Sequence, residues 1–166
     1  TLVKKITKLD EYLFDLNGYL IIRNALNKKE LKDLNNILDK LKNIKNDEWI
    51  GHVHGHNYGG KEGLNLQQIY EAGKPFEKLI DHPSWINHML HFVGGKGTFD
   101  HLHGPLFIDE NFANIRGPGE AIGIHSGNPE GLQRNHYRYQ NGKFHCSQVN
   151  ILLALTTIGP GDGGTV

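Results

Sequence analysis

The chain has 166 residues, a length that suits one domain with a sizeable core. Lysine plus arginine and aspartate plus glutamate each number 18, so no net charge draws the chain to nucleic acid or to a membrane surface. A single cysteine excludes an internal disulfide framework, no apolar run reaches the ~18 residues of a membrane span, and the first residues lack a signal-peptide core, so we expect a cytoplasmic protein.

A capped helix is predicted at the start of the chain. Thr7 can cap a helix over residues 8–16, and the pair Asn17-Gly18 ends it. Residues 19–23 are apolar and β-prone, which predicts a short, largely buried strand.

The clearest helix of the chain follows. Asn27 and Glu30 stand three residues apart and fit a capping box. Leucine and isoleucine then recur at helical spacing over residues 31–44, with lysine and aspartate on the other face. We interpret this helix as one that packs on the core, and a partner-binding helix is the alternative.

Residues 46–63 are irregular and rich in glycine, and they contain three of the eleven histidines. His52, His54 and His56 stand at every second position, so in a strand all three would share one face. Histidine is the commonest metal ligand, which makes such a face a candidate metal site. We interpret the segment as a surface loop, with a metal-binding strand as the alternative.

The middle of the chain predicts a strand over residues 64–70 and two short helices. The first of these helices begins at Pro75 and the second follows Pro83, with Ser84 as its cap. We expect surface or capping positions for the histidines in this part of the chain, His82, His88 and His91.

After Gly97 the pattern changes from helices to strands. The strands that we expect cover residues 98–103, 105–108, 121–125, 137–140 and 143–145, and a last long strand runs from residue 145 to 155 or beyond. Residues 109–120 predict a loop, and Asn141-Gly142 is typical of the two-residue turn of a hairpin. This order favours an α+β chain with a mainly β core, in which helices pack outside a sandwich or barrel.

A histidine in a glycine-rich segment suggests a metal centre. Iron(II) oxygenases bind the metal with two histidines and one carboxylate on one face, which leaves three positions open. In barrel sites the first histidine and the carboxylate usually stand two residues apart. Residues 123–127 read GIHSG and offer His125, but Gly127 stands where the carboxylate is expected.

Three segments together resemble the phytanoyl-CoA dioxygenase family of iron(II)/2-oxoglutarate oxygenases. Residues 14–26 read FDLNGYLIIRNAL and are similar to the family's opening. The GIHSG segment occupies the place of the first metal motif. Residues 154–166 read ALTTIGPGDGGTV and resemble the strand and turn that lead to the second metal histidine.

This resemblance implies one domain over residues 1–166, a double-stranded β-helix (jelly roll) with packed N-terminal helices. It implies an iron(II)/2-oxoglutarate-dependent dioxygenase that hydroxylates a small organic substrate, with iron(II) and 2-oxoglutarate as cofactors. His125 would then be the metal ligand and the catalytic residue. Neither nucleic acid nor a membrane is expected as a partner.

The chain differs from the family pattern in two places. Gly127 replaces the expected Asp, and the chain ends at Val166, before the second metal histidine and the basic residue that holds 2-oxoglutarate. We therefore expect the jelly roll to be C-terminally truncated. Related halogenases have Gly or Ala at the carboxylate position, so a halogenase is one alternative. A jelly-roll module that binds a small molecule without metal or redox chemistry is another.

Other residues are candidates for the same site. His101 and His103, followed by Glu110, resemble the His-x-His…Glu arrangement of cupins, although they can equally be barrel residues bonded to neighbours or water. Gln148 and Asn150 stand two apart on a predicted strand and so share a face. Because an unpaired buried amide costs about 1–3 kcal/mol, we expect both amides to line the cavity and hold the co-substrate, with a solvated outer face as the alternative.

Overall fold

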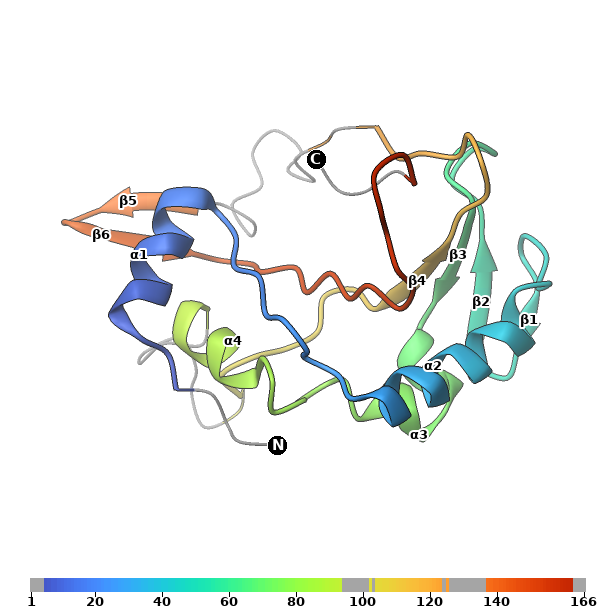
Figure 1. The fold of residues 1–166 in the computed structure, drawn as a ribbon, viewed down its shortest axis with the longest axis horizontal. Coiled ribbons are helices and arrows are strands. Elements are labelled where there is room, and N and C mark those ends of the chain that lie inside the picture. Colours follow the sequence, from blue (N-terminus) through green and yellow to red (C-terminus); the bar gives the residue numbers. More distant parts are fainter. Residues whose placement is uncertain (1–4, 94–101, 103, 124, 126–136, 163–166) are drawn as a thin grey trace. The chain divides into compact units, whose positions relative to one another are not determined.

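The computed structural model describes residues 5–93, 102, 104–123, 125 and 137–162. Over these residues the chain is α+β, as predicted, with short helices and antiparallel strands (Figure 1). It divides into two compact units. The hairpin unit comprises Thr1–Leu26, Asp81–Phe107 and His125–Ile151, and the sheet unit comprises Asn27–Ile80, Ile108–Ile124 and Leu152–Val166. That both units belong to one domain stays a prediction.

Two helices and a β-hairpin build the hairpin unit. Its elements are α1 (Lys8–Asn17), α4 (Ile86–Phe92), β5 (Tyr137–Gln140) and β6 (Lys143–Cys146). Helix α1 begins at the predicted cap, where Thr7 Oγ1 accepts a hydrogen bond from the Asp10 N–H (3.1 Å) and Asp10 Oδ2 accepts one from the Thr7 N–H (2.9 Å). Gly18 ends the helix with φ 76°, a left-handed conformation that glycine adopts without strain.

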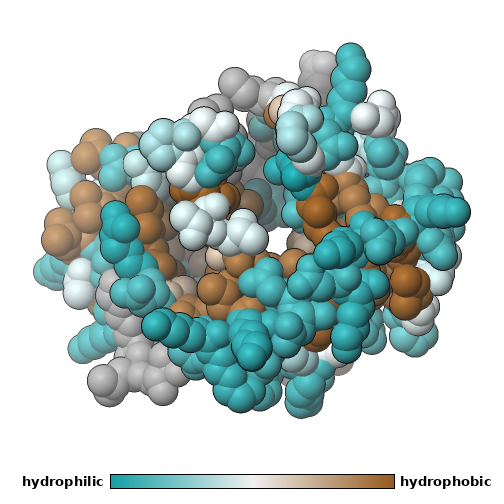
Figure 2. Space-filling model, turned by 45° about the vertical axis from the view of Figure 1, so that its right-hand side comes forward, coloured by the Kyte–Doolittle hydropathy of each residue, from teal (hydrophilic) through white to brown (hydrophobic). Residues whose placement is uncertain are grey.

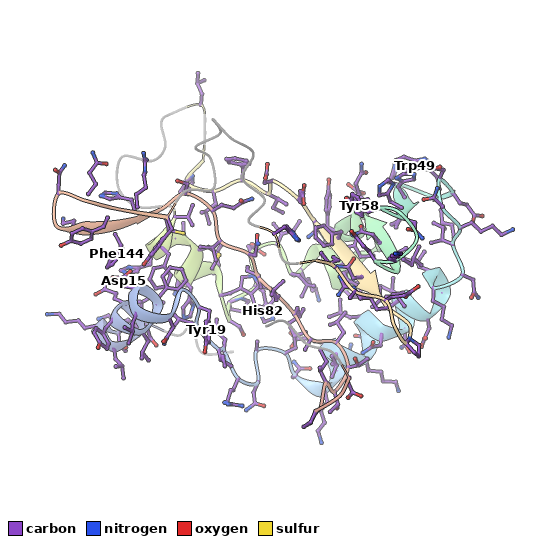
Figure 3. All side chains as sticks on the ribbon, turned by 90° about the horizontal axis from the view of Figure 1, so that it is seen from above. Asp15, Tyr19, Trp49, Tyr58, His82 and Phe144 are labelled. Atoms are coloured by element: carbon purple, nitrogen blue, oxygen red, sulfur yellow. The ribbon has the colours of Figure 1, made fainter. Side chains whose placement is uncertain are left out.

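Aromatic rings join the elements of the hairpin unit. The buried Phe14 stacks on Phe92 with ring centroids 4.1 Å apart and meets Tyr137 edge-on at 6.2 Å. Tyr137 stacks on Phe144 at 5.2 Å, and its hydroxyl donates to Asp15 Oδ1 at 2.8 Å; Figure 3 shows Asp15 and Phe144 side by side. Phe14 is the buried ring of this group, whereas Tyr137 and Phe144 are each 44% exposed, so the ring contacts and the Tyr137–Asp15 hydrogen bond together connect the hairpin to α1.

The hairpin itself forms where the sequence predicts it. Strands β5 and β6 pair antiparallel, with Gln140 opposite Lys143. Asn141 and Gly142 have φ values of 54° and 78°, the positive angles that a two-residue hairpin turn requires.

The sheet unit contains the larger sheet. Its elements are α2 (Lys28–Leu41), β1 (Trp49–Ile50), β2 (Val53–His56), β3 (Leu64–Gln67), the 3-10 helix η1 (Ile69–Ala72), α3 (Lys74–Glu77) and β4 (Phe112–Ile115). The four strands form one antiparallel sheet in the order β1-β2-β3-β4. Helix α2 begins at the predicted capping box, in which Asn27 Oδ1 accepts from the Glu30 N–H (2.9 Å) and Glu30 Oε2 from the Asn27 N–H (2.8 Å).

One face of this sheet is the core of the sheet unit. Residues paired across neighbouring strands share a face, and the pairing puts Val53, Gly55, Leu66 and Ala113 on the same one. Val53 and Leu66 are almost fully buried, as is Leu34 of α2. Outside the cores, hydrophobic side chains lie in separate patches among hydrophilic ones (Figure 2).

Gly55 is required where the chain after α2 crosses this face. A Cβ on Gly55 would collide with the Lys45 carbonyl oxygen and would lie 3.1 Å from Cγ2 of the buried Ile44. The missing side chain therefore lets the segment after α2 approach the sheet closely.

Two segments that the sequence predicts as loops contain strands. Residues 46–63 hold β1 and β2, and residues 109–120 hold β4. Strand β2 is paired on both sides, with β1 and with β3, and β4 is paired with β3. Pairing with adjacent strands thus overrides the weak β preference of glycine-rich sequence.

Other predicted strands are wrong. Within the described chain, residues 19–23, 105–108, 121–123 and 147–155 belong to no strand. Leu152 is exposed rather than buried, and the Leu155 carbonyl accepts a hydrogen bond from Asn35 Nδ2 of α2 at 2.8 Å. The Asn35 side chain thus bonds a backbone carbonyl that would face a neighbouring strand if the predicted strand had formed. Of residues 98–103, all but residue 102 lie outside the described chain.

The N-cap of helix α4 lies one residue later than predicted. Its N-cap is Trp85, because the Ser84 hydroxyl donates instead to the Ala25 carbonyl at 2.6 Å. His82 and His88, for which surface or capping positions are expected, are both buried, and His82 Nδ1 accepts a hydrogen bond from the Ser84 N–H at 3.2 Å. None of the helices in the described stretches is long and apolar enough to span a bilayer.

Candidate functional site

The second face of the sheet is polar, and it is the candidate site. Strand pairing places Trp49 opposite His54, His54 opposite Gln67, and His56 opposite Asn65. We call the following set the polar face: Trp49, His54, His56, Tyr58, Asn65, Gln67, Phe112 and Asn114. Tyr58 follows β2, and the other members belong to the strands. One sheet therefore separates an apolar core from a surface able to bind polar ligands.

A chain of amide hydrogen bonds crosses the polar face. Asn65 Nδ2 donates to Asn114 Oδ1 at 2.9 Å, and Gln67 Nε2 donates to Asn65 Oδ1 at 2.7 Å and to the Tyr58 hydroxyl at 2.8 Å. Asn65 is only 3% exposed, so these bonds offset the cost of burying its amide. Because both Nε2 protons of Gln67 are engaged, this residue would meet a ligand with its oxygen, a hydrogen-bond acceptor.

Four rings form an aromatic row along the same face, made of Trp49, His54, His56 and Tyr58. Trp49 stacks on His54 with ring centroids 4.5 Å apart, and His54 lies 5.8 Å from His56. His56 meets Tyr58 edge-on at 4.3 Å. Figure 3 labels Trp49 and Tyr58, which both belong to the sheet unit and are both about half exposed.

An open pocket with both polar and apolar lining adjoins Gln67. Its volume is about 560 Å³, and the residues that line it are Gln67, Gln68, Tyr70, Ile108, Asp109, Glu110 and Asn111. Asn111 is fixed, since its Oδ1 accepts from the Tyr70 N–H at 2.9 Å. Gln68 has φ 56° and turns the chain between β3 and η1. Two carboxylates and several amides thus surround a space large enough for a small molecule.

The predicted iron ligand and the two predicted cavity amides lie in the hairpin unit. His125 is exposed, Gln148 is half-buried and Asn150 is exposed. Gln148 and Asn150 do not lie on a strand, so the predicted alternation does not orient them. Cys146 Sγ–H donates to the Gln148 carbonyl at 3.0 Å, and burial raises the pKa of the Cys146 thiol, which keeps it protonated near neutral pH.

The other residues considered for the metal site lie mostly outside the described chain. His101, His103 and Gly127 lie outside the described residues, and Glu110 lines the pocket beside Gln67. Over the described stretches, no three His, Cys, Asp or Glu side chains gather in a group that could hold a metal ion. An imidazole such as that of His125 suits iron, but the described residues do not complete an iron centre.

Sequence reasoning missed most of the polar face. Trp49 and Tyr58 lie in a predicted loop, and Asn65 and Gln67 lie in a predicted strand. The signal was present in residues 64–67, where leucine alternates with a polar amide.

No family model matches the chain, and neither a curated protein nor a solved structure is significantly similar to it. The resemblance to the phytanoyl-CoA dioxygenase family therefore stands on the three sequence segments that carry it.

Proposed function

We propose that the protein is an iron(II)- and 2-oxoglutarate-dependent dioxygenase that hydroxylates a small organic substrate on a jelly-roll domain. The observation that supports this best is the two-sided sheet, with an apolar core on one face and bonded amides and imidazoles on the other. A jelly-roll cavity needs an inner wall of this kind, in which polar groups are fixed and oriented on a rigid sheet.

The proposal gives distinct roles to the predicted residues. His125 is the iron ligand, since its imidazole is exposed and imidazole nitrogen binds iron(II) well. The side-chain amides of Gln148 and Asn150 donate hydrogen bonds to the carboxylate of 2-oxoglutarate. Bound iron would supply the oxidation chemistry, and the protein would orient the reactants and exclude water.

Iron binding tests the role of His125. We expect iron(II), titrated without oxygen, to bind the full-length protein at a 2-oxoglutarate-dependent site that His125→Ala removes. His145→Ala is the matched control, because His145 is also exposed and lies on β6 outside the proposed site. Equal iron affinity in the two variants would show that His125 is not the ligand.

A second function is favoured by the pocket beside Gln67, namely binding of a small molecule without redox chemistry. The carboxylates of Asp109 and Glu110 can accept hydrogen bonds and carry negative charge. The side-chain oxygen of Gln67 is a further acceptor and carries a partial negative charge. Such a pocket suits a ligand rich in hydroxyl or amino groups.

A ligand screen tests this second function. We expect a polyol or polyamine to raise the melting temperature of the wild-type protein, and Asp109→Asn together with Glu110→Gln to abolish the shift. A matched control is Asp39→Asn with Glu77→Gln, because both carboxylates are exposed and lie outside the pocket. A shift that survives in the pocket variant would place the ligand elsewhere.

A further inference from the structure

We propose that His54 and His56 form a binding site for a divalent transition-metal ion, such as copper(II), nickel(II) or zinc(II). The site lies on the polar face of the sheet unit and does not include His125. It therefore goes beyond the proposed iron chemistry and does not depend on it.

Strand geometry brings the two imidazoles to one face. His54 and His56 stand two apart on β2, so both side chains project from the same side of the sheet. The backbone between them is held from both edges, because β2 pairs with β1 and with β3. Gly55 adds two further bonds, since its N–H donates to the Glu48 carbonyl (2.9 Å) and its carbonyl accepts from the Asp47 N–H (2.8 Å). The histidines are thus preorganised before any metal arrives.

The separation of the rings suits a shared metal. Their centroids lie 5.8 Å apart and their planes are tilted by 38°. Two imidazoles on one ion can have centroids up to about 6.4 Å apart, because each metal–nitrogen bond is about 2.1 Å. A metal can therefore bridge the pair by rotation of the side chains, without movement of the strand.

Neighbouring groups favour a cation at this position. Asp47 Oδ1 lies 3.7 Å from His54 Nε2 and places a negative charge beside the site. Trp49 stacks on His54, and Tyr58 meets His56 edge-on. With two imidazole ligands, water completes the coordination sphere. Imidazole sites bind copper(II) most tightly among the first-row divalent ions, so copper(II) is the best probe.

His52 provides a matched control within the same sequence repeat. It continues the spacing of His54 and His56, but it lies before β2, next to Gly51 in a turn with φ 62°, and it is exposed. If a flexible histidine-rich segment bound the metal, all three histidines would contribute alike. In the proposed strand site only His54 and His56 bind it.

Trp49 provides a reporter for bound copper. A copper(II) ion held by His54 lies next to the stacked indole ring and quenches its fluorescence. The second tryptophan, Trp85, belongs to the hairpin unit. We expect Trp49→Phe to remove the copper-dependent quenching while calorimetry still records full copper affinity. Quenching that persists in this variant would place the metal away from β2.

The decisive experiment titrates copper(II) into the wild-type protein and the variants His52→Ala, His54→Ala and His56→Ala, with circular dichroism as the folding check. Losing one of two ligands lowers the affinity by about 100-fold, which we expect for His54→Ala and His56→Ala. Gln replacements at positions 54 and 56 repeat the test should an alanine variant unfold. We expect His52→Ala to retain wild-type affinity. Equal losses in the His52 and His54 variants, or no copper binding by the wild type, would overturn the proposal.

Discussion

Asn65 is the residue on which the order of the polar face depends. Its side chain is buried, donates to Asn114 and accepts from Gln67. Removing it leaves two partner groups short of a hydrogen bond, so we expect Asn65→Ala to lower the free energy of unfolding by about 1–3 kcal/mol. Asn36→Ala is the control, since Asn36 is exposed on α2 and alanine favours helix. Identical urea midpoints for Asn65→Ala and wild type would contradict this role.

Single-residue features that depend on the nearby sequence could be predicted, whereas features that depend on contacts in the folded chain could not. The caps Thr7 and Asn27 and the turn at Asn141 and Gly142 depend on bonds and angles within a few residues, and all were predicted correctly. The need for Gly55 comes from the carbonyl of Lys45, ten residues earlier, and it becomes visible only when the chain has folded.

Among the elements, α2 is the one that the sequence specifies most completely. Its capping box uses the Asn27 side chain, so we expect Asn27→Ala to lower the free energy of unfolding by about 1 kcal/mol. Asn27→Ser keeps a side-chain acceptor for the Glu30 N–H and should remain close to wild type. Urea denaturation followed by circular dichroism measures both. Equal losses for the two variants would show that the cap contributes nothing.

The strands show why elements are harder to predict than caps. Strand β2 was interpreted as a loop because glycine and histidine have little β preference, yet pairing on both sides makes it a strand. Residues 147–155 have the opposite composition and form no strand, and the Leu155 carbonyl at their end bonds Asn35 of α2. In both cases the groups with which the backbone forms hydrogen bonds, rather than the composition of the segment, go with the structure that it adopts.

For the whole molecule, the α+β class followed from sequence, but the grouping of residues into units did not. His125, Gln148 and Asn150 belong to the hairpin unit, whereas the polar face belongs to the sheet unit. Each unit is assembled from three stretches distant in sequence, so no local pattern reports which side chains share a unit. The jelly roll stays a proposal that rests on the family resemblance and on the two-sided sheet.

The most direct test of the proposed function is release of succinate from 2-oxoglutarate by the full-length protein. With iron(II) and oxygen, we expect succinate to form well above the rate without added iron. His125→Ala should abolish this release, and His145→Ala should leave it unchanged. Absence of succinate from the wild-type protein, or equal release by the two variants, would contradict the account, whereas copper binding at His54 and His56 would be unaffected by either result.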